Sequence, residues 1–187
     1  MPASPLLTLE PLIDAVRAGV ESLGWELSGL QKTTSHQFEG RWEGESTRSA
    51  YLFFHSIDGP EWASVDVYLD ETGRGVAGNL ALVADLEAMG RLGLARPLMS
   101  SLAGVADRHL DSRHRRPLTL RFSIADAADQ VESAETEVRF KVRIPGRVVA
   151  LGAPAVETFT VESIRAFEGM LESPDLAERA AEEMGEG

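Results

Sequence analysis

Hydrophobic residues recur with helical spacing near the start of the chain. Neighbouring members of this set are one, three or four residues apart, and they are Leu12, Ile13, Val16, Val20 and Leu23. Residues at such spacings lie on one face of a helix and form an apolar stripe. The pattern predicts an amphipathic helix over residues 9–23 that ends at Gly24, because glycine is common just after a helix.

Three segments that follow are typical of β-strands. Residues 37–45 place Phe38 and Trp42 on one side and charged side chains on the other. Residues 49–57 are mostly apolar on both sides, which suits a central strand. Residues 62–69 alternate again with the period of two that a half-buried strand requires. The short links between them predict an antiparallel meander.

The remainder of the chain predicts more helix and strand. The expected elements are a middle helix over 79–110 that is broken near Pro97, strands at 117–125 and 136–144, an optional short strand at 147–151, and a last helix from about Val161. Runs of consecutive strands favour an α+β fold over a repeating βα pattern. We therefore expect one α+β domain over residues 1–187, in which 172–187 form a flexible acidic tail.

Composition narrows the function classes. The chain has 187 residues, 43% of them hydrophobic, and a net charge of -12. An acidic protein is a poor binder of nucleic acid or anionic membrane, because phosphate binding needs a basic surface. The absence of cysteine excludes disulfides, thiolate nucleophiles and Cys-ligated metals. No secretory signal or membrane-length apolar run is visible, so we expect a cytoplasmic protein.

The order of elements resembles that of type III secretion chaperones and the related YbjN-like proteins. These are small, acidic, cysteine-poor bacterial proteins with a helix, a three-stranded meander, a middle helix, two more strands and a last helix. The resemblance covers about residues 9–171 as an order of elements, without a signature motif. It implies a non-enzymatic homodimer that binds an extended segment of another protein. Of the 18 basic residues only Lys32 and Lys141 are lysines, which is consistent with a GC-rich bacterial genome.

Residues 73–78 spell GRGVAG, which fits the GxGxxG pattern of dinucleotide-binding loops. In that motif glycines let backbone amides approach a pyrophosphate at a helix N-terminus. Here Asp70 and Glu71 stand beside the loop and would repel phosphate, and no acidic residue follows at the end of a second parallel strand. We therefore expect a glycine-rich connection into the middle helix, and leave anion binding by the loop as the alternative.

The densest basic cluster covers residues 108–116 and includes Arg113, Arg115 and Arg116. These arginines can pair with a carboxylate or phosphate. They can equally complement the C-terminal dipole of the middle helix, or pair with the acidic tail or a second subunit. The tail, in turn, is either a solvated segment or an arm that docks a basic partner.

Eight of the aromatic residues fall in the first 70 positions and include Trp42, Phe53 and Trp62. They predict either the core under the meander or an aromatic sheet face or edge that holds a peptide or an apolar ligand. His55 lies in the apolar central run and is expected to face inward, with Asp66 on the next strand as a candidate acid/base partner. No HExxH, GxSxG or P-loop motif is present, so no catalytic, metal or cofactor site is recognisable.

These observations predict a non-catalytic, chaperone- or adaptor-like protein that binds another protein or peptide, with homodimerisation as a second expectation. The partner-binding candidates are Trp42, Phe53 and Trp62 for apolar contact and Arg113, Arg115 and Arg116 for charge pairing. One alternative is a small-molecule-binding protein or unusual enzyme that uses His55 and Asp66 in a pocket between sheet and helices. Another is a structural subunit of a larger complex. No cofactor, metal, nucleic acid or membrane is expected.

Overall fold

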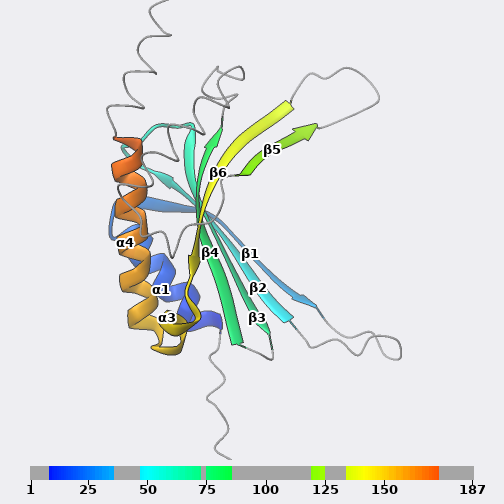
Figure 1. The fold of residues 1–187 in the computed structure, drawn as a ribbon, viewed down its shortest axis with the longest axis vertical. Coiled ribbons are helices and arrows are strands. Elements are labelled where there is room, and N and C mark those ends of the chain that lie inside the picture. The colour runs from blue at the N-terminus through cyan, green and yellow to red at the C-terminus, as the bar shows by residue number, and fades with distance from the viewer. Residues whose placement is uncertain (1–8, 36–46, 73–74, 86–118, 125–133, 173–187) are drawn as a thin grey trace, which may run out of the picture.

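The computed structural model describes residues 9–35, 47–72, 75–85, 119–124 and 134–172. In chain order the elements are α1 (Leu9–Glu21), β1 (Trp25–Ser35), β2 (Thr47–Ser56), β3 (Ala63–Thr72), β4 (Gly75–Asp85), β5 (Thr119–Ile124), β6 (Ala134–Ile144), α3 (Gly146–Ala150) and α4 (Ala153–Leu171). The strands form one antiparallel sheet in the order β1-β2-β3-β4-β6-β5. The α+β class is therefore confirmed (Figure 1).

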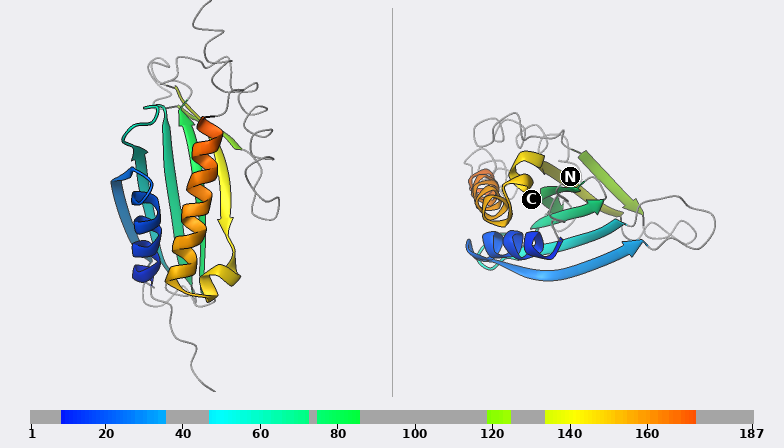
Figure 2. Two further views of the ribbon diagram at one scale, coloured as in Figure 1. Left: turned by 90° about the vertical axis from the view of Figure 1, so that its left-hand side faces the viewer. Right: turned by 90° about the horizontal axis from the view of Figure 1, so that it is seen from below.

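Both long helices lie on the same face of the sheet. Figure 2 shows α1 and α4 side by side in front of the strands. They approach closely at Gly19, where an added Cβ would lie 3.1 Å from the Glu157 carbonyl oxygen and from Thr160 Cβ. Only glycine allows this approach without a shift of the neighbouring helix.

The apolar core lies between this helix pair and the sheet. Alternate residues of β2, β3, β4 and β6 point into it because successive side chains of a strand point to opposite faces. The core members of these strands are Ala50, Leu52, Phe54, Val65, Val67, Leu69, Leu80, Leu82, Ala84, Val138, Phe140, Val142 and Ile144. The predicted stripe of α1 packs against them, and the chain leaves the helix through Gly24 at φ 80°.

Several strand predictions are confirmed, while the first strand was missed. The segments predicted at 49–57, 62–69 and 136–144 correspond to β2, β3 and β6, and that at 117–125 to β5. β1 was not predicted because its sequence, WELSGLQKTTS, has a bulge between Leu27 and Gly29 that interrupts the alternation. The strand predicted at residues 37–45 lies outside the described residues.

The helix predicted from Asn79 is wrong for residues 79–85, which belong to β4. The run Leu80–Ala84 is buried on both faces of the sheet, and a short continuous apolar run fits a helix and a central strand equally well. Pairing with β3 and β6 decides in favour of the strand. The meander before residue 86 thus has four strands. The rest of the predicted middle helix, including Pro97, lies outside the described residues.

The glycine-rich motif joins two strands and does not lead into a helix. Thr72 of β3 pairs with Gly75 of β4, so the expected connection into the middle helix is wrong, and the strand-then-helix context of a dinucleotide fingerprint is absent. Gly78 has a packing reason instead. A Cβ there would lie 2.7 Å from Leu69 Cδ2 and 3.0 Å from Ile144 Cδ1.

Two predictions near the C-terminal helix are also wrong. The strand predicted at 147–151 is the short helix α3, although its valines favour strand. The last helix begins at Ala153, eight residues before the predicted start. Gly152, at φ 94°, ends α3, and Pro154 suits the first turn of α4. Val156 and Phe159 then extend the buried stripe toward the N-terminus of α4.

We predict that Gly78→Ala lowers the free energy of unfolding by about 1–3 kcal/mol, because the new methyl group overpacks the contact with Leu69 and Ile144. Gly146→Ala is the matched control, since nothing lies within 4 Å of a Cβ at that position. Urea denaturation of both variants measures the difference. Equal stability of the two variants would contradict the close approach at Gly78.

Candidate functional site

The sheet face opposite α1 and α4 carries most of the chemically interesting side chains. We call it the open face, because no helix among the described residues lies on it (Figure 1), although Ala81 and Val83 at its centre are buried. Register places its side chains in rows across the strands. One row runs Tyr51, Tyr68, Asn79, Arg143; the next runs Phe53, Asp66, Ala81, Lys141; the third runs His55, Ser64, Val83, Arg139.

An aromatic pair stands on β2 and β3. The rings of Tyr51 and Tyr68 are tilted, with centroids 4.8 Å apart, and Tyr51 is 38% exposed. Burial raises the pKa of Tyr68, and the negative charge of Asp70 raises it further, while a hydrogen bond with Ser49 opposes the shift. The phenol therefore stays neutral to a higher pH than a free tyrosine. A neutral, partly exposed aromatic surface suits contact with apolar or peptide groups.

Arg139 is the centre of an ion-pair network on the same face. Its Nη1 lies 2.6 Å from Asp66 Oδ2, and its Nε lies 2.9 Å from Glu137 Oε2. Burial alone would lower the pKa of Arg139, but the hydrogen bond with Glu137 and the charge of Asp66 outweigh it, so the pKa is raised. The side chains of Arg139 and Asp66 are each 17% exposed. The two carboxylates neutralise Arg139, and its ion pair with Asp66 joins β3 to β6.

Two further cations follow Arg139 at alternate positions of β6. Lys141 and Arg143 point to the open face, because Val142 and Ile144 occupy the core positions between and after them. Neither has an ion-pair partner within the part of the chain that the structure describes. We call Lys141 and Arg143 the positive column; the same face also carries the acids Asp66, Asp70 and Glu137.

His55 and Asp66, the candidate acid/base pair, are not direct cross-strand neighbours. Both lie on the open face, but His55 is opposite Ser64, whereas Asp66 is opposite Phe53 and binds Arg139. His55 is exposed rather than inward-facing, and its Nε2 lies 3.7 Å from Glu26 Oε2. Between the sheet and the two long helices, where the alternative function placed a pocket, lie the buried apolar side chains of the core.

The other predicted partner-binding residues are scattered. Phe53 is half-buried on the open face, where its ring lies against Gly29 of the neighbouring strand. Trp62 is partly buried and packs against the apolar core. The remaining four candidates, Trp42, Arg113, Arg115 and Arg116, lie outside the described residues, so their role stays a prediction.

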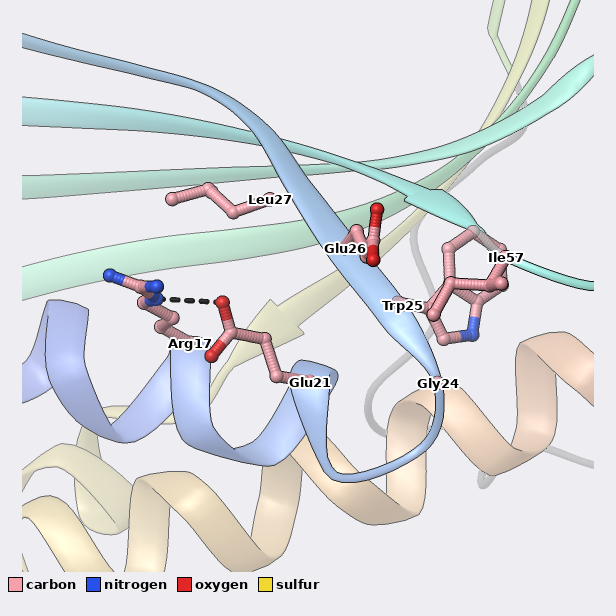
Figure 3. Close-up of a pocket in the computed structure, with 7 residues that line it drawn as sticks. All are labelled: Arg17, Glu21, Gly24, Trp25, Glu26, Leu27 and Ile57. Carbon is pink, nitrogen blue, oxygen red and sulfur yellow. Dashed lines mark hydrogen bonds and ion pairs between the residues drawn. The ribbon is translucent and has the colours of Figure 1, made fainter.

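A second candidate site lies at the β1 edge of the sheet. Among the residues that the structure describes, β1 pairs with β2 alone, and Leu30 on β1 is 42% exposed. Beside the start of β1 is a shallow, open depression between the strand and the end of α1 (Figure 3). Its lining consists of Arg17, Glu21, Gly24, Trp25, Glu26, Leu27 and Ile57. Arg17 and Glu21 form an ion pair of 2.7 Å on its helical wall.

Neither surface offers a metal site. No group of three or more His, Cys, Asp or Glu side chains suited to a metal ion occurs in the described ranges. The described helices are also too short or too polar to span a membrane. Comparisons with models of known protein families, with curated proteins and with solved structures found no match.

Sequence reasoning missed both the positive column and Leu30, although the alternation along β6 already indicated the positive column. The segment VRFKVRI alternates core residues with Arg139, Lys141 and Arg143, so its period of two already placed three cations on one face. Leu30 had no comparable signal, because the bulge in β1 hides which face of the strand it occupies.

We predict that Asp66→Asn lowers the free energy of unfolding by about 1–3 kcal/mol, because it leaves the half-buried Arg139 with one carboxylate fewer. A double-mutant cycle with Arg139→Gln, followed by urea denaturation, should give a favourable coupling energy of about 1–2 kcal/mol. Asp58→Asn, at an exposed position, is the control and should be neutral. A coupling energy near zero would mean that the ion pair contributes nothing to stability.

Proposed function

We propose that this chain is a non-catalytic, chaperone- or adaptor-like protein that holds an extended segment of another protein along β1. The observation that carries the proposal is the outer side of β1, which pairs with no strand among the described residues. This strand is 11 residues long and stands at the edge of the described sheet; its first residues line an open depression, and Leu30, three residues after Leu27, is exposed.

The physical basis is strand addition. An edge strand presents unpaired N–H and C=O groups that can pair with an extended peptide, while nearby pockets select its alternate side chains. Proteins usually protect such edges with bulges or lysines. β1 has both devices, at Leu27/Gly29 and at Lys32, but the bulge leaves Leu30 to Ser35 in regular register with β2. That stretch is long enough to pair with a short peptide.

The surroundings of β1 indicate what the bound segment contains. Trp25, Leu27 and Ile57 give the depression an apolar surface, and Ile57 is 59% exposed. An apolar side chain of the added strand would bury area there. Glu26 lines the same depression, whereas Glu21 there is already paired with Arg17, so a basic residue of the bound segment would be favoured beside Glu26.

The order of elements supports this proposal by analogy. Type III secretion chaperones and YbjN-like proteins, which it resembles, typically bind an extended segment of another protein. This chain shares with them the terminal helices and the antiparallel sheet, but has a fourth strand before residue 86. Such an analogy suggests a class of partner and leaves the binding surface to be argued from the residues of β1.

We predict that Leu30→Asp reduces partner binding at least about tenfold, because it places a charge on the surface where the added strand would lie. The matched control is Leu151→Asp, since Leu151 is a leucine that is 77% exposed in the turn before α4, away from β1. The partner is first captured from lysate with the wild-type chain. Its affinity for each variant is then measured, together with hydrogen exchange of the β1 amides in the complex.

Protection of the β1 amides together with selective loss in Leu30→Asp is the expected result. Equal loss in both variants, or protection confined to other strands, would contradict binding at β1. A particle of twice the monomer mass, with protection of β1 and no other protein present, would instead show that β1 pairs with a second copy.

A further inference from the structure

The positive column of β6 is unusual in this protein. Lys141 and Arg143 are two of only 18 basic residues against 30 acidic ones. Arg139 is neutralised by Asp66 and Glu137, while the two cations that follow it have no partner among the described residues. Unpaired cations on an otherwise acidic surface attract a negatively charged segment to that place and to few others.

The chain itself carries such a segment directly after α4. Residues 173–187 contain five acids against one base, a net charge of -4. The acids are Asp175, Glu178, Glu182, Glu183 and Glu186, and the base is Arg179. The two large apolar side chains of the segment, Leu176 and Met184, are suited to contact with an aromatic surface.

α4, which precedes this segment, ends at the same end of the sheet as Val138 but on the face opposite Lys141 and Arg143, so the segment has to pass round an edge of the sheet to reach them. Near the end of α4, Glu168 accepts a 3.1 Å hydrogen bond from Trp25 Nε1. Trp25 begins β1, opposite the end of β2, and Val138 lies beside Ala84 at the same end of the sheet. From Val138 to Arg143 the distance along β6 is about 17 Å at 3.3–3.4 Å per residue. The fifteen residues after Glu172 can extend to about 50 Å.

We propose that residues 173–187 dock on the open face of the same chain. Carboxylates of the segment pair with Lys141 and Arg143, and its apolar side chains lie on Tyr51 and Tyr68. The tether keeps the segment at a high effective concentration, so weak contacts suffice. Because exposed ion pairs contribute little each and are screened by salt, docking is reversible and weakens as ionic strength rises.

Residues 173–187 would then compete with any acidic ligand for the open face. A partner with an acidic, apolar-containing segment would have to displace residues 173–187 before it could bind there. This inference concerns a different surface from β1 and does not depend on the proposed function. The basic cluster at 108–116 and a second copy of the chain are rival docking sites that the experiment below separates.

Paramagnetic NMR of the full-length chain tests the proposal. Because the chain has no cysteine, Ala181→Cys allows a single spin label within the acidic segment. At low ionic strength we expect the amide signals of Tyr68, Lys141 and Arg143 to lose most of their intensity. The signals should recover in high salt and in the variant Lys141→Glu/Arg143→Glu.

The matched control is Arg147→Glu/Arg165→Glu, which makes the same change in net charge at two exposed arginines on α3 and α4. It should leave the broadening of the open-face signals unchanged. The variant Lys141→Glu/Arg143→Glu is informative only if it still folds. The spectrum of this variant without the spin label shows whether it does.

Three outcomes would overturn the proposal. Uniformly unbroadened spectra would mean that the segment does not dock. Broadening confined to residues 108–116 would place it on the other basic cluster. In a third experiment, spin-labelled chain without ¹⁵N is mixed with ¹⁵N-labelled chain that has no spin label. Broadening in this mixture would mean that the segment docks on a second molecule.

Discussion

The burial of one apolar sheet face by two helices from opposite ends of the sequence is the constraint on which the rest of the structure depends. α1 and α4 are separated by more than 130 residues, yet both must be present to cover the alternate apolar residues of β2, β3, β4 and β6. Their contact is close at Gly19, where the Thr160 side chain occupies the space that a Cβ would need. Trp25 and Glu168 connect the end of α4 to the first strand.

Once the helices occupy one face, strand register determines the chemistry of the other. The period of two directs Asp66, Arg139 and Lys141 away from the core. Cross-strand neighbours then decide which charges are neutralised: Arg139 reaches two carboxylates, whereas Lys141 is opposite Ala81 and finds none in the described part of the chain. The uneven charge of this face is thus a consequence of register, and the same register places Tyr51 beside Tyr68.

The edge of the sheet follows from the same architecture. Because β1 directly follows α1, its first residues stay beside the end of that helix, and the turn through Gly24 shapes the depression there. The bulge after Leu27 shifts the alternation, so that Leu30 shares the side of Leu52 yet lies beyond the cover of α1. An apolar side chain next to unpaired backbone is the usual composition of a surface that binds an extended chain.

The sequence alone determined the elements whose hydrophobic period was clear. α1, β2, β3 and β6 follow from local alternation or helical spacing, because those patterns depend only on which side of an element faces the core. The absence of cysteine and the acidic charge likewise needed no structure. Two fold predictions went wrong where one local pattern fits two structures: the run Leu80–Ala84 suits a helix or a central strand, and Val148–Val149 suits a strand or a helical turn.

Tertiary structure decided these cases and the composition of both candidate surfaces. Pairing on both sides made β4 a strand, and packing against α4 made α3 a helix. Register placed His55 opposite Ser64 and brought Asp66 to Arg139, a contact between residues 73 positions apart. Which residues meet across a sheet depends on non-local pairing, and a single sequence without a fixed register contains no direct record of that pairing.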